Sequence, residues 1–165
     1  MRKTIAILAG VLMLAAVNWG ILGRERLLED GRVVLLELAP LDPRSLMQGD
    51  YMALRFKVAD EAFGRFGRRK EAADGRVVVK LGERGVGSYV RLDAGESLAP
   101  GEIVLRYRIR EGRLKFATNA FFFQEGTAKL YERARYGEFR VAPDGEMLLT
   151  HLIGDKFERL GPPRR

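Results

Sequence analysis

Hydrophobic and polar positions divide the chain into an uncharged N-terminal run and a longer remainder of short apolar segments separated by turns. The run Thr4–Leu22 contains no charged residue. At about 1.5 Å per residue it spans roughly 28 Å as a helix, close to the hydrocarbon thickness of a bilayer. Trp19, near its end, suits an anchor at the membrane–water interface. The pattern predicts an uncleaved transmembrane helix within residues 1–23, in contact with the lipid bilayer through residues 4–22.

Two other interpretations of the run remain open, a cleaved secretory signal and a buried core helix. Arg2 and Lys3 form the basic start that a signal has. However, the segments around Ala16 and Gly20 place bulky or polar residues where a cleavage site requires small ones. Basic residues flank both ends of the run, so the distribution of charge favours an N-terminus in the cytoplasm only slightly. We expect a single-pass protein of the bacterial inner membrane with residues 24–165 in the periplasm.

The remainder predicts a β-rich fold. Segment Tyr51–Val58 alternates Met52, Leu54 and Phe56 with more polar neighbours, the period of a half-buried strand. Glycine- and proline-containing turns separate the apolar segments. The further predicted strands are Val33–Leu38, Arg76–Leu81, Ser88–Leu92, Glu102–Ile109, Lys115–Thr118, Gly137–Val141 and Glu146–Ile153. The expected fold class is mainly β, an antiparallel sandwich or barrel-like sheet with one short helix.

Three segments depart from the strand pattern. Asp60–Ala73 is charged and contains glycine, which predicts a loop or a short helix. Gly126–Tyr136 has strong helix formers, with Leu130 and Ala134 on one face, and is the helix we predict. The tail, residues 161–165, is expected to be disordered. We therefore predict that residues 24–160 form one extracytoplasmic domain.

Composition narrows the class of protein. The chain has a formal net charge of +7 and no cysteine, and the lack of cysteine fits an oxidising compartment. Its basic residues are scattered, with short clusters only at Arg65–Lys70 and at the C-terminal end. We therefore expect no nucleic-acid partner. Two explanations of the basic balance remain open, a domain close to anionic lipid head groups and an arginine-rich proteome.

The residues offer little catalytic or metal-binding chemistry. His151 is the one histidine and lies in an apolar segment, where a structural or surface role is the usual one. No calcium loop, phosphate loop or dinucleotide fingerprint is present, so we predict no metal and no cofactor. A serine–lysine peptidase would use Ser45 with Lys57 or Lys80, but Ser45 lacks the sequence context of those enzymes. We predict a non-enzymatic protein with no catalytic residues.

The segment Leu41–Phe56 carries more specific residue choices than a generic turn requires. Pro43 fixes its own φ and holds Asp42 extended, so the Asp42 carboxylate is placed to accept backbone N–H bonds. Gly49 is suited to a positive φ at the entry to the following strand. The Asp50 carboxylate can accept hydrogen bonds from backbone amides of that corner that have no other partner. Two roles remain open: a structural clamp, and a recognition site formed by Arg44, Asp50 and Tyr51.

Two blocks of sequence resemble a known family. Gly49–Phe56 (GDYMALRF), preceded by Leu41–Arg44 (LDPR), resembles the motif of the GDYXXLXY family of bacterial membrane-anchored proteins. Its Leu54 stands at the motif leucine, and Phe56 replaces the final tyrosine. A second block resembles the C-terminal part of the family: an aromatic strand, Glu125-Gly126, Tyr131-Glu132 and the strand Gly137–Val141 before Asp144-Gly145.

The resemblance implies an anchor, one extracytoplasmic β-rich domain and an accessory role beside an integral membrane protein. Our function hypothesis is therefore a non-enzymatic periplasmic domain that binds or stabilises such a partner. The alternative is a small-ligand or glycan-binding domain. We also predict that the Leu41–Tyr51 corner and the Glu125–Glu132 segment meet in space, with Arg44 facing Glu125 or Glu132.

Overall fold

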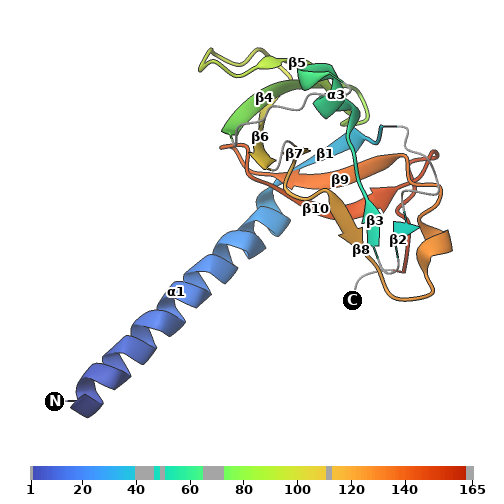
Figure 1. Cartoon of the computed structure of the whole chain (residues 1–165). Helices are drawn as coiled ribbons and strands as arrows, with labels where there is room; N and C mark the ends of the chain where they lie inside the picture. Colours follow the sequence, from blue (N-terminus) through green and yellow to red (C-terminus); the bar gives the residue numbers. More distant parts are fainter. Residues whose placement is uncertain (1, 40–46, 49–50, 65–72, 111–112, 163–165) are drawn as a thin grey trace.

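The N-terminal apolar run forms one long helix, α1 (Arg2–Asp30), which extends away from a β-rich body (Figure 1). The computed structural model describes residues 2–39, 47–48, 51–64, 73–110 and 113–162. Within α1, the stretch Ile7–Asp30 is long and apolar enough to cross a membrane, and the protein buries none of its apolar window. The helix is confirmed, and it continues past the predicted Leu22 to join the body at Gly31.

Three antiparallel sheets make up the body, which confirms the mainly β fold class. The first has the order β1 (Arg32–Glu37), β9 (Tyr136–Val141) and β10 (Met147–Ile153). The second has the order β2 (Met47–Gln48), β3 (Tyr51–Ala53) and β8 (Ala120–Phe122). The third has the order β5 (Gly87–Leu92), β4 (Ala73–Leu81), β6 (Glu102–Arg110) and β7 (Arg113–Lys115).

The strand predicted over Tyr51–Val58 is shorter than expected. It ends as β3 at Ala53, and the chain turns into α3 (Lys57–Phe63). Arg55 donates two hydrogen bonds to Asp60 in the first turn of α3, at 2.7 and 2.9 Å, and a carboxylate there also favours the helix N-terminus. The alternation of burial nevertheless persists, with Met52, Leu54, Phe56 and Val58 all buried.

The helix predicted over Gly126–Tyr136 is wrong. Only Ala128–Leu130 form a turn of 3-10 helix, η1, and Leu130 is exposed. The side chain that the body buries is Tyr131, which packs against Phe121 and Phe123. Burying this ring overrides the helix propensity of the segment, and the short helix of the fold is α3 instead.

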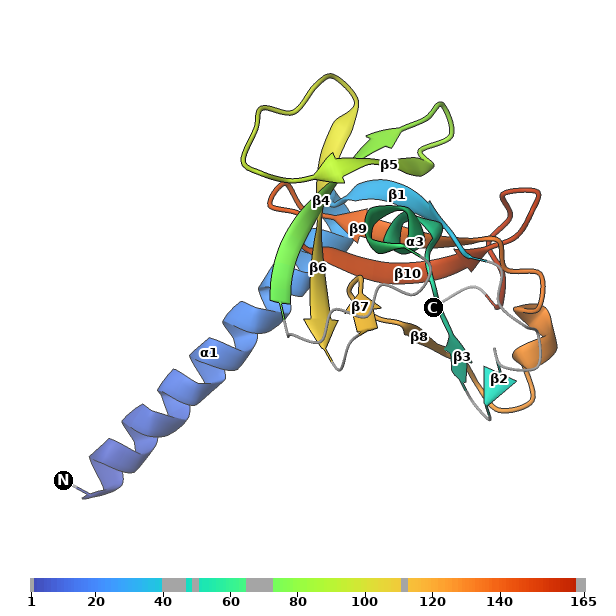
Figure 2. The same ribbon diagram turned by 45° about the horizontal axis from the view of Figure 1, so that its top comes forward.

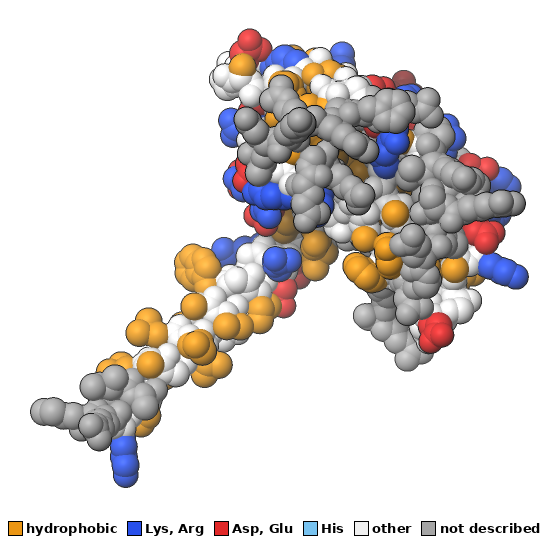
Figure 3. All heavy atoms as spheres, in the orientation of Figure 1, with side chains coloured by type: hydrophobic (Ala, Val, Ile, Leu, Met, Phe, Trp, Pro, Cys, Tyr) orange, Lys and Arg blue, Asp and Glu red, His pale blue; other side chains and the backbone are white. Residues whose placement is uncertain are grey.

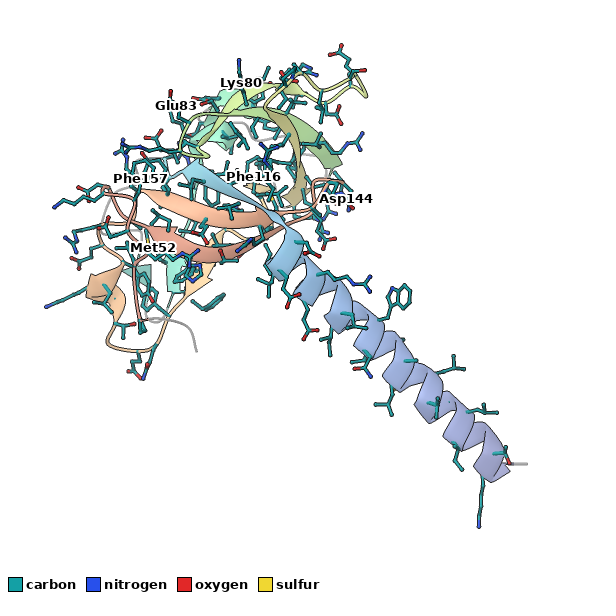
Figure 4. All side chains as sticks on the ribbon, turned by 180° about the vertical axis from the view of Figure 1, so that it is seen from behind. Met52, Lys80, Glu83, Phe116, Asp144 and Phe157 are labelled. Atoms are coloured by element: carbon teal, nitrogen blue, oxygen red, sulfur yellow. The ribbon has the colours of Figure 1, made fainter. Side chains whose placement is uncertain are left out.

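A cluster of aromatic side chains joins the three sheets. Phe56, just after β3, packs edge to face against Phe139 of β9 and against Phe116, which follows β7, with ring centroids 5.3 and 6.3 Å apart. Phe139 is fully buried and the other two are 1% exposed. Figure 4 shows Phe116 pointing into the middle of the body. The core therefore lies where the three sheets meet.

The small sheet of β2, β3 and β8 lies on the same side of the body as α1, at the end opposite β5 (Figures 1 and 2). The end of α1 meets the first sheet, where Arg140 donates a hydrogen bond of 3.0 Å to the carbonyl of Gly31.

Candidate functional site

The two sequence blocks that resemble one family pair directly as strands. Strand β3 belongs to the first block and β8 to the second, and they are antiparallel neighbours. Their register places Tyr51 opposite Phe122, and Met52 opposite Phe121. Strand β8 is one of the two outer strands of this sheet among the residues that the structure describes. The two blocks thus form one structural unit.

Side chains alternate between the two faces of β8. Phe121 is buried and its ring lies 5.2 Å from that of Tyr131, while Phe123, just after the strand, stacks on Tyr131 with ring centroids 5.3 Å apart. Phe122 points outward instead, and its ring lies 5.8 Å from that of Tyr51. We call this outward pair, Tyr51 and Phe122, the aromatic edge.

The aromatic edge is unusual in its exposure. Phe122 is 70% exposed, the highest value of any large hydrophobic side chain in the described part of the body. Figure 3 shows hydrophobic side chains gathered over β3 and β8. A single exposed hydrophobic residue needs no explanation, but a large aromatic supported by a second ring on a sheet edge is typical of a binding surface.

The other predicted site residues fall into two groups in the described structure. Leu54 and Phe56 are 4% and 1% exposed and belong to the core. Glu125 and Glu132 are exposed, in the turns on either side of η1. Gly126 has a φ of +79°, a conformation that residues with side chains rarely adopt, so this position requires glycine.

The remaining predicted residues, Asp42, Pro43, Arg44, Gly49 and Asp50, lie outside the described residues, as does Ser45. The contact between Arg44 and Glu125 or Glu132 therefore stays a prediction, and so does the choice between a clamp and a recognition site.

Several polar side chains surround Glu138 on β9, a residue that the sequence pattern did not single out. The residue is 5% exposed, and its carboxylate accepts hydrogen bonds from Arg159 at 2.9 and 3.1 Å and from the Thr150 hydroxyl at 3.1 Å. The His151 ring lies 3.2 Å from the same carboxylate. Burial raises the pKa of Glu138, but the Arg159 and Thr150 bonds and the nearby His151 outweigh it and hold the pKa below its ordinary value.

This group is best understood as a structural tie. Arg159 follows β10 in the chain, in a segment whose Leu160 amide donates a hydrogen bond of 2.8 Å to the carbonyl of Leu152. The ion pair of Arg159 with Glu138 therefore holds the segment around Arg159 against the first sheet. His151, expected to be structural or at the surface, is half-buried beside it.

Other candidate chemistry is sparse in the described part of the chain. Within residues 2–39, 47–48, 51–64, 73–110 and 113–162, no three His, Asp or Glu side chains are grouped so as to hold a metal ion. Lys57, one of the two lysines weighed for a peptidase dyad, is exposed and pairs with Glu37 at 3.4 Å.

Comparison with protein families tests the resemblance that the two sequence blocks, Leu41–Phe56 and the segment from the aromatic strand to Gly145, suggested. Residues 13–152 match the family model described as GDYXXLXY protein, which confirms the resemblance seen in the two blocks. The comparison with curated proteins gives no match, and neither does the comparison with solved structures. The matched range includes both strands of the aromatic edge.

Proposed function

The chain belongs to the GDYXXLXY protein family, and from this premise we propose that it is a non-enzymatic, membrane-anchored accessory protein. Helix α1 crosses the inner membrane of a bacterium once, and the β-rich body lies in the periplasm. The body binds or stabilises an integral membrane partner through the aromatic edge.

The exposed Phe122, supported by Tyr51, is the observation that carries this proposal. Exposed aromatic side chains are enriched among the residues that dominate protein–protein binding, because they bury a large rigid area on association. The exposed charged residues Glu125 and Glu132 follow in the same block and suit the polar rim of such a surface.

The anchor supports the choice of an integral membrane partner. Strands β3 and β8, which carry the aromatic edge, lie on the same side of the body as α1, at the end opposite β5 (Figures 1 and 2). A partner held in the same bilayer meets this surface at a high effective concentration, so a small aromatic contact is enough for stable association. A soluble partner would gain nothing from this placement.

A photo-crosslinking amino acid at position 122 of the full-length protein tests the proposal. We expect a cross-linked product that contains an integral membrane protein, identified by mass spectrometry. The same probe at position 90, an exposed valine on β5 at the opposite end of the body, is the control and should give no such product.

The substitution Phe122→Ala gives the second measurement. Loss of a binding anchor of this kind costs about 2 kcal/mol or more, which lowers affinity roughly 30-fold. Recovery of the partner in detergent should fall accordingly, while Val90→Ala should leave it unchanged. Equal recovery with both variants and no cross-link at position 122 would contradict the proposal.

A further inference from the structure

A basic cavity of about 320 Å³ lies where the end of α1 meets the body. Its lining includes Arg24 from α1, Arg106 and Arg108 from β6, Lys115 from β7 and Glu146 before β10. Figure 3 shows Lys and Arg side chains gathered on the body next to the end of the helix. The cavity is distinct from the aromatic edge and draws on other elements.

Most of the positive charge in this cavity is not neutralised. Arg106 pairs with Asp144 at 2.8 Å, and Figure 4 shows Asp144 beside the end of α1. In the described part of the chain, Arg24, Arg108 and Lys115 form no ion pair, and neither does the Glu146 side chain. Arg24, Arg108 and Lys115 therefore line the cavity with a single carboxylate, Glu146. Arg108 also lies near Asp74 of β4, whose pKa it helps to lower.

The register of β6 and β7 makes this excess of positive charge in the cavity more unusual. Arg108 of β6 lies directly opposite Lys115 of β7 in the antiparallel ladder. Like charges at directly opposed positions destabilise a sheet, because their Cβ atoms lie only about 5 Å apart. Asp74 of β4 lies opposite Arg108 on its other side but is paired with Arg110 at 2.7 Å, so a bound anion would offset the remaining repulsion.

The position of the cavity along α1, relative to the uncharged run, indicates which anions can reach it. The uncharged run ends at Leu22, and Arg24 lies two residues further along the helix, roughly 3 Å beyond it. If the run fills the hydrocarbon layer, the cavity lies at the level of the lipid head groups. Basic cavities at that level are suited to anionic lipid phosphates.

We propose that Arg24, Arg108 and Lys115 bind a phosphate group, in the form of an anionic phospholipid head group or of soluble phosphate. The arginine guanidinium groups match phosphate oxygens in geometry, and Lys115 adds a point charge. The bound anion links α1 to the paired strands β6 and β7. It therefore fixes the orientation of the body relative to the membrane.

The test uses the full-length protein in detergent, titrated with phosphatidylglycerol and, separately, with phosphatidylcholine, and bound lipid is measured by native mass spectrometry. The pocket variant is Arg108→Gln with Lys115→Gln. Each basic residue near an anionic group contributes roughly fivefold in affinity, so the variant should bind phosphatidylglycerol about 25-fold more weakly. Wild-type protein should prefer phosphatidylglycerol to phosphatidylcholine.

The control variant is Lys129→Gln with Arg133→Gln, which removes the same charge from exposed residues around η1. Its affinity should change less than twofold. The pocket variant is expected to fold, since it removes a like-charge pair, and circular dichroism checks this. Lys115→Gln alone provides a milder second variant, with an expected fivefold loss.

Titration with inorganic phosphate by calorimetry distinguishes the source of the phosphate. If the pocket variant loses lipid binding, the ligand is a lipid head group. If it loses only inorganic phosphate binding, the ligand is a soluble phosphate. Unchanged binding of both by the pocket variant, or an equal loss in the control variant, would overturn the proposal.

Discussion

Replacing Phe56 with alanine should strongly destabilise the packing that joins the three sheets. The side chain is 1% exposed and packs against Phe139 of β9 and against Phe116, which directly follows β7 of another sheet. Removing it deletes a buried ring, leaves a cavity and breaks both edge-to-face contacts. Phe56 is also the last residue of the family motif, so the substitution tests whether this position is structural.

The magnitude follows from the burial. A fully buried Phe→Ala change costs about 3–5 kcal/mol, while a domain of this size has a total stability of about 5–15 kcal/mol. The corresponding drop in melting temperature is roughly 10–20 °C. Phe122→Ala makes the same chemical change at a residue that is 70% exposed, so it should cost less than about 0.5 kcal/mol.

Both variants should be measured as full-length protein in detergent, by thermal and urea denaturation followed by far-ultraviolet circular dichroism. The helical signal of α1 has to be subtracted, since a membrane helix in detergent does not melt with the body. A large loss for Phe56→Ala and almost none for Phe122→Ala would place the first residue in the core and leave the second available for binding. Similar losses for the two variants, or a stable Phe56→Ala protein, would refute this reasoning.

The sequence predicted most strands because their signal is local. Alternating burial along residues 51–58 survives even where the strand has ended, since Leu54, Phe56 and Val58 are buried whichever backbone hydrogen bonds form. The point where β3 ends and α3 begins could not be predicted, because it depends on the bridge between Phe56 and Leu38. Long-range pairing of this kind leaves no local pattern.

The candidate site was predictable only in part for the same reason. Each family-like block was visible in the sequence, and Tyr51 was among the residues singled out. Phe122 gained its significance from its pairing with Tyr51 across two strands. Likewise, nothing near Glu138 indicates that Arg159 will neutralise it, and the opposition of Arg108 to Lys115 appears only in the register of β6 and β7.

Three further predictions test separate parts of the structure. The run Thr4–Leu22 should keep the mature protein in the membrane fraction after carbonate extraction, with an intact N-terminus by mass spectrometry; a mass that starts beyond Gly20 would show cleavage instead. Gly145 has a φ of +87° and lies against Val104, so an alanine there would be strained and Gly145→Ala should lower the melting temperature. An unchanged melting temperature would show that alanine is not strained at this position. Finally, the lowered pKa of Glu138 predicts how stability depends on pH. Its ionised form is favoured by folding, so its contribution is present above the unfolded-state pKa of about 4.3 and is lost as the pH falls through the lower folded-state pKa. Glu138→Gln should therefore cost about 1–3 kcal/mol at neutral pH, because Arg159 loses its partner, and should flatten the decline of urea stability below about pH 4.3. Parallel pH profiles for variant and wild type would show that this carboxylate is not ionised against Arg159 in the folded protein.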